Sequence, residues 1–278
     1  MKISVITPSF RSSKWLKLCI PSVADQKGPA FEHIVQDGGS DDGTQDWLPR
    51  DPRVKAFIEK DQGMYDAVNR GFRRAQGDIL CYLNCDEQFL PGALQSVAEY
   101  FQSHPDVDVM FADTVVTDAN GQYICHRFAL LPLKHHTWYR VTMLTCSMFI
   151  RRRVVADLGI YFDTKWRDNG DMCWLLEVLN RNLRLGVMRR FTSVFADTGE
   201  NMNLKPNAQR ETQLLKSMIP KWVRRMRPAI LFYHKWRMLA RGAYTQKPFD
   251  YSLYTFASPE RRVTEHVARP TGLWRGRY

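Results

Sequence analysis

Short apolar runs alternate with amphipathic stretches along the first hundred residues of this chain. Continuous β-branched runs are typical of buried strands, and apolar positions three or four residues apart are typical of helices that cover a sheet. Val68, Phe72 and Ala75, for example, recur at i, i+4 and i+7. The pattern predicts strands at residues 3–7, 31–36, 54–58 and 79–83, and helices at residues 14–24, 64–75 and 91–103.

Strands that alternate with helices at this spacing predict an α/β fold, with a mostly parallel sheet and helices on both faces. In such sheets, ligands bind beyond the carboxyl ends of the strands. The segments that follow the four strands are polar, and three of them are rich in carboxylates: residues 7–9, 37–44, 59–63 and 84–87. Because acids gathered at one edge repel one another, this clustering indicates a bound cation.

The second half of the chain is less regular. It predicts strands at residues 107–112 and 123–128 around an Asn120-Gly121 turn, and helices at residues 154–158 and 171–180. We expect a boundary near residues 203–209, after which a basic helical extension begins.

The net charge of +11 is concentrated in this extension. Residues 216–241 contain eight Lys or Arg residues and no acidic residue, interleaved with aromatic and aliphatic side chains. Such a segment fits an anionic membrane surface. It fits equally well a solvated basic helix that packs its aromatic face on the domain. No nucleic-acid-binding motif accompanies the charge, so we expect no nucleic-acid partner.

The composition, with 44% hydrophobic and 25% charged residues, is that of an ordinary globular protein. No apolar run approaches 18 residues, and the first residues lack the pattern of a signal peptide. The six cysteines are scattered without a CxxC pair, and Cys81 and Cys85 flank an apolar stretch as core residues would. We therefore expect a cytoplasmic protein without disulfides.

Five sequence strings, in order along the chain, resemble the inverting glycosyltransferases of family 2 with the GT-A fold. They are SVITPSF (4–10), QDGGSDDGT (36–44), EKDQGMYDAVNRG (59–71), GDILCYLNCDE (77–87) and GDMCWLLEVL (170–179). The resemblance covers residues 2–200. It implies a hexosyltransferase-like enzyme that moves a sugar from a nucleotide-diphosphate sugar, preferably UDP-linked, to a saccharide or lipid-linked acceptor in bacterial surface-polysaccharide or glycolipid synthesis.

The resemblance also implies a division of the chain. Residues 1–208 form the GT-A domain, with a nucleotide-binding half (1–105) and an acceptor half (106–208), and residues 209–278 form the extension. The donor nucleotide would be bound from the ends of the first strands and from the helix that follows the third. The residues implied in donor binding are Thr7, Ser9, Asp37, Asp61, Gly63, Asn69 and Asn84. Asp37 also fits a simple turn-former before two glycines, and Asn69 also fits a solvated helix face.

The family binds a divalent metal with an Asp-x-Asp motif at the end of the fourth strand. Here the string is Asn84-Cys85-Asp86-Glu87, so Asp86 stands in the ligand position and an amide replaces the first carboxylate. The resemblance implies Mn²⁺ or Mg²⁺ bound through Asp86, where it neutralises the departing diphosphate.

The family takes its catalytic base from a Glu-Asp pair at the start of a helix. Here the pair reads Gly170-Asp171, so Asp171 is the implied base. Asp168 is a competing candidate, and Asp171 also fits a helix-capping role. A dinucleotide oxidoreductase would need a GxGxxG string after the first strand, which is absent. The departures at Asn84 and Gly170 leave one alternative, an inactive homologue that acts as a membrane-associated partner in a polysaccharide-assembly complex.

Overall fold

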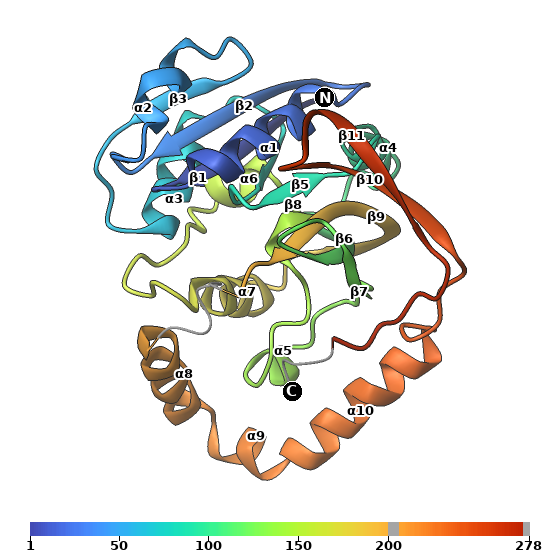
Figure 1. Cartoon of the computed structure of the whole chain (residues 1–278). Coiled ribbons are helices and arrows are strands. Elements are labelled where there is room, and N and C mark those ends of the chain that lie inside the picture. Colours follow the sequence, from blue (N-terminus) through green and yellow to red (C-terminus); the bar gives the residue numbers. More distant parts are fainter. Residues whose placement is uncertain (200–205, 275–278) are drawn as a thin grey trace.

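The structure is a computed structural model, and it describes residues 1–199 and 206–274. Within these residues, a nine-stranded sheet has the order β3-β2-β1-β4-β8-β6-β9-β5, with β7 paired to β6 (Figure 1). Its strands are β1 (Lys2–Ser9), β2 (Ala30–Asp37), β3 (Lys55–Ile58), β4 (Ile79–Tyr82), β5 (Glu87–Phe89), β6 (Val109–Asp118), β7 (Tyr123–Arg127), β8 (Met148–Arg151) and β9 (Leu185–Asp197).

The predicted α/β fold is confirmed. β1 pairs in parallel with β2 and β4, and β2 pairs in parallel with β3, so all four strands predicted in the first half are present. In the second half, β8 runs antiparallel to both β4 and β6, which makes the sheet mixed. The strands predicted near residues 107–112 and 123–128 correspond to β6 and β7, whereas β5, β8 and β9 were not predicted.

Helices cover both faces of the sheet. Along β4, Ile79 and Cys81 belong to the core beneath α1 and α4, while Leu80 and Tyr82 belong to the core beneath α3, α6 and α7. This alternation follows from the two-residue period of a strand. The helices of the first 199 residues are α1 (Ser13–Ala24), α2 (Thr44–Trp47), α3 (Met64–Arg74), α4 (Ala93–Ser103), α5 (Lys134–Thr137), α6 (Arg152–Ala156) and α7 (Gly170–Asn180). All six cysteines are free, and Cys81 and Cys85 are buried as expected.

The C-terminal extension is helical only in its first part. Three helices, α8 (Pro206–Met218), α9 (Lys221–Arg225) and α10 (Arg227–Ala240), are followed by a hairpin of β10 (Phe249–Thr255) and β11 (Ser258–Val267). The hairpin was not predicted from the sequence. Among the described residues, no helix has both the length and the apolar character needed to cross a membrane.

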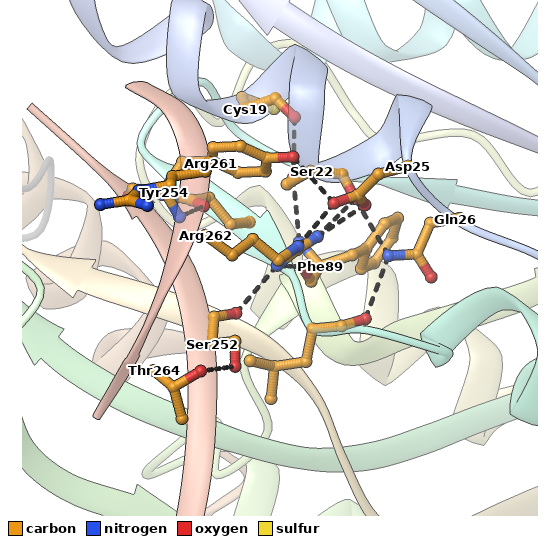
Figure 2. Close-up of polar contacts among 12 residues, drawn as sticks. Cys19, Ser22, Asp25, Gln26, Phe89, Ser252, Tyr254, Arg261, Arg262 and Thr264 are labelled. Atoms are coloured by element: carbon orange, nitrogen blue, oxygen red, sulfur yellow. Dashed lines mark hydrogen bonds and ion pairs between the residues drawn. The ribbon is translucent and has the colours of Figure 1, made fainter. Parts of the chain in front are cut away.

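The hairpin is fastened to α1 and β5 by one arginine (Figure 2). The Arg262 guanidinium contacts both carboxylate oxygens of Asp25, at 2.6 and 2.8 Å, and donates to the backbone oxygens of Ser22, Phe89 and Ser252. A bidentate Arg–carboxylate pair of this kind is strong and geometrically specific. The end of the extension therefore packs back onto the first half of the chain.

Candidate active site

A cavity of about 1510 Å³ opens where the first strands of the sheet end. One part of its wall comes from the carboxyl ends of β1 to β4, at Ser9, Gly38, Asp61 and Asn84. Another part comes from residues 140–145 and from residues 167–172 at the start of α7. The predicted binding edge is therefore hollow, and all four polar segments contribute to it.

The structure brings six of the predicted site residues to the cavity wall. They are Ser9, Asp61, Gly63, Asn84, Asp86 and Asp171. The three others, Thr7, Asp37 and Asn69, are buried and form internal hydrogen bonds.

Thr7 and Asp37 support the wall from behind. The Asp37 carboxylate accepts hydrogen bonds from the backbone N–H groups of Gly39 and Ser40, at 3.0 and 2.8 Å, and from the Ser40 hydroxyl at 2.7 Å. It thereby shapes the loop after β2, whose glycines line the cavity. The Thr7 hydroxyl lies 2.9 Å from Nε2 of the buried His33.

Asn69 bonds to the backbone of a distant segment. Its amide donates to the Phe162 carbonyl at 2.8 Å and accepts from the Phe162 N–H at 3.0 Å. This pair of bonds ties α3 to the segment that precedes α7. The side chain is thus occupied by protein backbone in this structure.

Asp61 and Phe10 both line the cavity close to Gly38. The Asp61 carboxylate accepts from the Gly63 N–H at 2.9 Å, and burial raises its pKa above the ordinary value. A Cβ on Gly38 would lie 2.8 Å from Asp61 Oδ2 and 3.3 Å from the Phe10 ring, so only glycine fits beside them without a shift. The Phe10 ring is 57% exposed and lines the cavity. Sequence reasoning did not single out Phe10, although an exposed ring beside a carboxylate suits a planar base.

The residues after β4 suit a hard divalent cation. Burial raises the pKa of Asp86, and burial together with the neighbouring Asp86 charge raises the pKa of Glu87. The buried oxygens Asn84 Oδ1 and Glu87 Oε1 find no hydrogen-bond partner among the described residues. A cation bound beside these carboxyl groups would therefore stabilise their charged forms, and the neighbouring amide oxygen of Asn84 is available as a further ligand.

A purely protein-made metal cage is not present in the described part of the chain, where no group of three or more His, Cys, Asp or Glu side chains could hold a metal ion. Mg²⁺ and similar ions commonly use one or two carboxylates and take their other ligands from water and substrate phosphates. Asp86 with Asn84 fits that kind of site.

Asp171 lies in the first turn of α7 and lines the same cavity. Burial raises the pKa of its carboxyl group to about 6, although the N–H groups of Met172 and of Asp171 itself and the Tyr65 hydroxyl partly offset the rise. Its backbone N–H donates to the Tyr65 hydroxyl at 3.1 Å. A carboxyl group with a pKa near neutrality and access to a cavity has the properties of a general base.

Tyr65 also explains the glycine that precedes Asp171. A Cβ on Gly170 would lie 2.6 Å from the Tyr65 ring. The side chain expected there from the family pattern therefore has no room, because an aromatic ring fills its place. Asp168, the competing candidate, also lines the cavity, but its carboxylate accepts a hydrogen bond from the Asn207 amide of α8.

Glu211 is a site-forming residue that the sequence did not reveal. Its buried carboxylate, on α8, accepts hydrogen bonds from the backbone N–H groups of residues 167, 168 and 169, at 2.7, 3.0 and 2.9 Å. Burial would raise its pKa, but these donors and Asn207 outweigh burial and lower it. The N-cap residue of α7, Asn169, makes no side-chain capping bond. Glu211 thus satisfies N–H donors just before the helix that carries Asp171.

Two solved structures share this architecture. TarS 1-349 of S. aureus in complex with UDP-GlcNAc matches with a TM-score of 0.59 and 18% identity, over 79% of this chain and 65% of that one. The mannosyltransferase PcManGT of Pyrobaculum calidifontis, in complex with GDP-Man and Mn²⁺, matches with a TM-score of 0.52 and 16% identity, over 87% of this chain and 79% of that one. These similarities establish the GT-A type of fold.

The chain belongs to glycosyl transferase family 2, whose family model matches residues 4–159. An uncharacterized glycosyltransferase of Nostoc sp. is 32% identical over 62% of this chain and 58% of its own length. A PGL/p-HBAD biosynthesis glycosyltransferase of Mycobacterium bovis is 32% identical over 43% of this chain and 49% of its own length. A putative teichuronic acid biosynthesis glycosyltransferase of Bacillus subtilis is 33% identical over 35% of this chain and 41% of its own length. The chain thus matches about half the length of these curated relatives.

Proposed function

We propose that the protein is an inverting glycosyltransferase that moves a sugar from a nucleotide-diphosphate sugar, preferably UDP-linked, to an acceptor hydroxyl. The observation that carries this proposal is that a single cavity is lined both by the Asn84–Asp86 edge, which is short of positive charge, and by Asp171, whose pKa is raised to about 6. The named glycolipid and teichuronic acid relatives support an acceptor in bacterial surface-polysaccharide or glycolipid synthesis.

The donor would enter along the ends of β1 to β4. Phe10 offers a stacking surface for the base, and Asp61, Ser9 and the Gly63 backbone offer polar contacts within the same cavity. Thr7, Asp37 and Asn69 would act indirectly, by holding the wall and the two halves in place. Asp86, with Asn84, would hold Mn²⁺ or Mg²⁺, and that ion offsets the charge of the leaving diphosphate when it is bound.

Asp171 would take the proton of the acceptor hydroxyl. As the acceptor oxygen forms its bond to the anomeric carbon, the bond to the diphosphate oxygen breaks and the O–H proton moves to the Asp171 carboxylate. A single displacement of this kind inverts the anomeric configuration. The Tyr65 hydroxyl and the three N–H bonds to Glu211 would keep this carboxylate and its helix in position.

We also propose that the enzyme works peripherally at the inner face of a membrane. The support is the basic segment of residues 216–241 and its exposed rings. An inactive, membrane-associated assembly partner remains the second candidate. The glycine at position 170, in place of the Glu of the family pattern, does not favour an inactive protein, since the nearby Tyr65 ring leaves no room for a larger side chain.

Donor hydrolysis distinguishes the enzyme from the inactive partner. The purified chain is incubated with a panel of UDP- and GDP-sugars, with and without Mn²⁺ or Mg²⁺. We expect metal-dependent release of nucleoside diphosphate from at least one donor, and its loss in Asp86→Ala. The control is Asp106→Ala, which removes an exposed acid that is paired with Arg184. Absence of turnover with every donor, or full activity in Asp86→Ala, would overturn the proposal, and NMR of the transfer product tests inversion.

A further inference from the structure

The outward side of α8, α9 and α10 is unusually apolar. Of the fourteen large hydrophobic side chains that are exposed in the described chain, eight lie on these helices and their junctions. Phe232 is 72% exposed, and Trp222 and Trp236 are 55% and 56% exposed. We call this surface the apolar-basic face, and its apolar members are Leu214, Met218, Trp222, Met226, Phe232, Tyr233, Trp236 and Leu239.

The face follows helical geometry. In α10, Phe232, Trp236 and Leu239 recur at i, i+4 and i+7, so they project from one side of the helix. His234 points the other way, is 7% exposed, and stacks on His136 with ring centroids 3.7 Å apart. The helix therefore contacts the rest of the protein through the side that carries His234 and exposes the opposite side.

The same helices carry a strong positive charge. Residues 216–241 include eight Lys or Arg residues without an acidic one, and seven of them are exposed: Lys216, Lys221, Arg224, Arg225, Arg227, Lys235 and Arg241. Rings among cations suit the headgroup region of an anionic bilayer, where rings reach the acyl boundary and cations meet lipid phosphates. A second copy of this chain is disfavoured, because a self-complementary interface would bring two such positive faces together.

The inner sides of these helices hold the segments that line the cavity. Glu211 of α8 bonds to the backbone of residues 167–169, which adjoin Asp171. The Tyr139 hydroxyl donates to the Val223 carbonyl of α9 at 2.8 Å, just before the cavity-lining residues 140–145. In Figure 1, α8 to α10 form an arc beyond α5 and α7, away from β1 to β3. The apolar-basic face is thus the outside of a layer of helices whose inner side holds the segments at the Asp171 side of the cavity.

We propose that the apolar-basic face lies on an anionic bilayer, and that the acceptor is a lipid-anchored molecule presented to the Asp171 side of the cavity from that bilayer. The acceptor part of this inference rests on the proposed glycosyl transfer, whereas the membrane part does not. Confining enzyme and acceptor to one surface raises their effective concentration, so transfer to an anchored acceptor gains over transfer to a soluble one.

The membrane part is tested by sedimentation of the full chain with vesicles of phosphatidylcholine alone and of phosphatidylcholine with phosphatidylglycerol. We expect binding to the anionic vesicles that weakens with salt and falls by at least about tenfold in Trp222→Ser/Phe232→Ser/Trp236→Ser. Leu158→Ser removes another exposed apolar side chain, which lies outside these helices, and should leave binding unchanged. A thermal melt verifies that each variant is folded.

Three results would overturn the membrane part. They are equal vesicle binding by the triple variant, tighter binding to RNA than to the anionic vesicles, or a dimer in analytical ultracentrifugation that the triple substitution dissociates without any vesicle binding.

The acceptor part is tested with a hexosyl diacylglycerol in anionic vesicles and with the corresponding methyl hexoside in solution. We expect faster transfer to the anchored acceptor, a loss of that advantage in the triple variant, and unchanged donor hydrolysis in both proteins. Equal transfer to the two acceptors would overturn the lipid-anchored acceptor. Absence of donor hydrolysis in the unmodified chain would instead overturn the proposed function. The membrane part would then still be decided by the vesicle sedimentation alone.

Discussion

Replacing Asp171 with Asn should stabilise the fold at neutral pH while it removes the proposed base. Burial raises the pKa of this carboxyl group from 3.8 to about 6 in the folded protein. Each pKa unit corresponds to about 1.4 kcal/mol, so the charged carboxylate costs the folded state up to about 3 kcal/mol at pH 7 and above. Because Asp171 borders the cavity and is only partly buried, solvent reduces this figure, and we expect about 1–3 kcal/mol.

The sign of the pH dependence follows from the raised pKa. Well below pH 3.8, the ordinary pKa of the group, the carboxyl group is protonated in both folded and unfolded chains, and it contributes no pH-dependent cost. As the pH rises towards 6 and beyond, the unfolded chain releases the proton more readily, and the folded state loses stability. Asn is neutral throughout and keeps an oxygen to accept the Met172 N–H, which bonds to Asp171 Oδ1 at 2.7 Å.

The assay is urea denaturation of both proteins between pH 5 and pH 8. The free energy of unfolding of Asp171→Asn should exceed that of the unmodified protein by an amount that grows with pH. Asp106→Asn is the control, since its ion pair with Arg184 lowers the pKa of that carboxyl group and its substitution should give no gain. A difference that is zero, negative or independent of pH would refute the assignment of a partly buried, charged carboxylate at this position.

Four further predictions concern Asp171 and the residues around it. The same Asp171→Asn variant should transfer sugar about 10²- to 10⁴-fold more slowly with a nearly unchanged KM for the donor, and unaltered turnover would remove Asp171 from the role of base. Tyr65→Phe keeps the ring but loses the hydroxyl that lowers the Asp171 pKa, so the acidic limb of the kcat–pH profile should move to higher pH; an unmoved limb would contradict this. Glu211→Gln should lower kcat by a larger factor than it changes the donor KM, because a neutral amide holds the three N–H groups less firmly. Changes of equal factor in kcat and in the donor KM would point to a merely structural role. Gly170→Ala should lower the melting temperature through its contact with the Tyr65 ring, and Tyr65→Leu in the same chain should restore part of the loss; a melting temperature equal to that of the unmodified protein would show that the ring moves freely.

Local pattern was enough to predict the strands β1 to β4 and the helices between them. The apolar runs of β1 to β4 and the apolar spacing of α3 are properties of neighbouring residues. Because the carboxyl ends of parallel strands lie at the same edge of a sheet, the polar segments that follow these strands are predicted at one edge. Asn84 and Asp86 lie two residues apart, so their shared place at the cavity wall follows from the end of β4. The short strand β5 and the long, partly exposed strand β9 gave no comparable signal, because their pairing depends on distant partners.

The sequence by itself determined the α/β class, the edge where the cavity lies, and the residues that approach it from their own strand ends. Only the tertiary structure decided which side chains reach the cavity and which support it. Gly170 meets the Tyr65 ring, Asn69 bonds to Phe162, and Glu211 bonds to residues 167–169 across long stretches of chain. The physical reason is that periodicity reports which face of an element is apolar, whereas a hydrogen bond or a steric limit between distant residues exists only after the elements have packed.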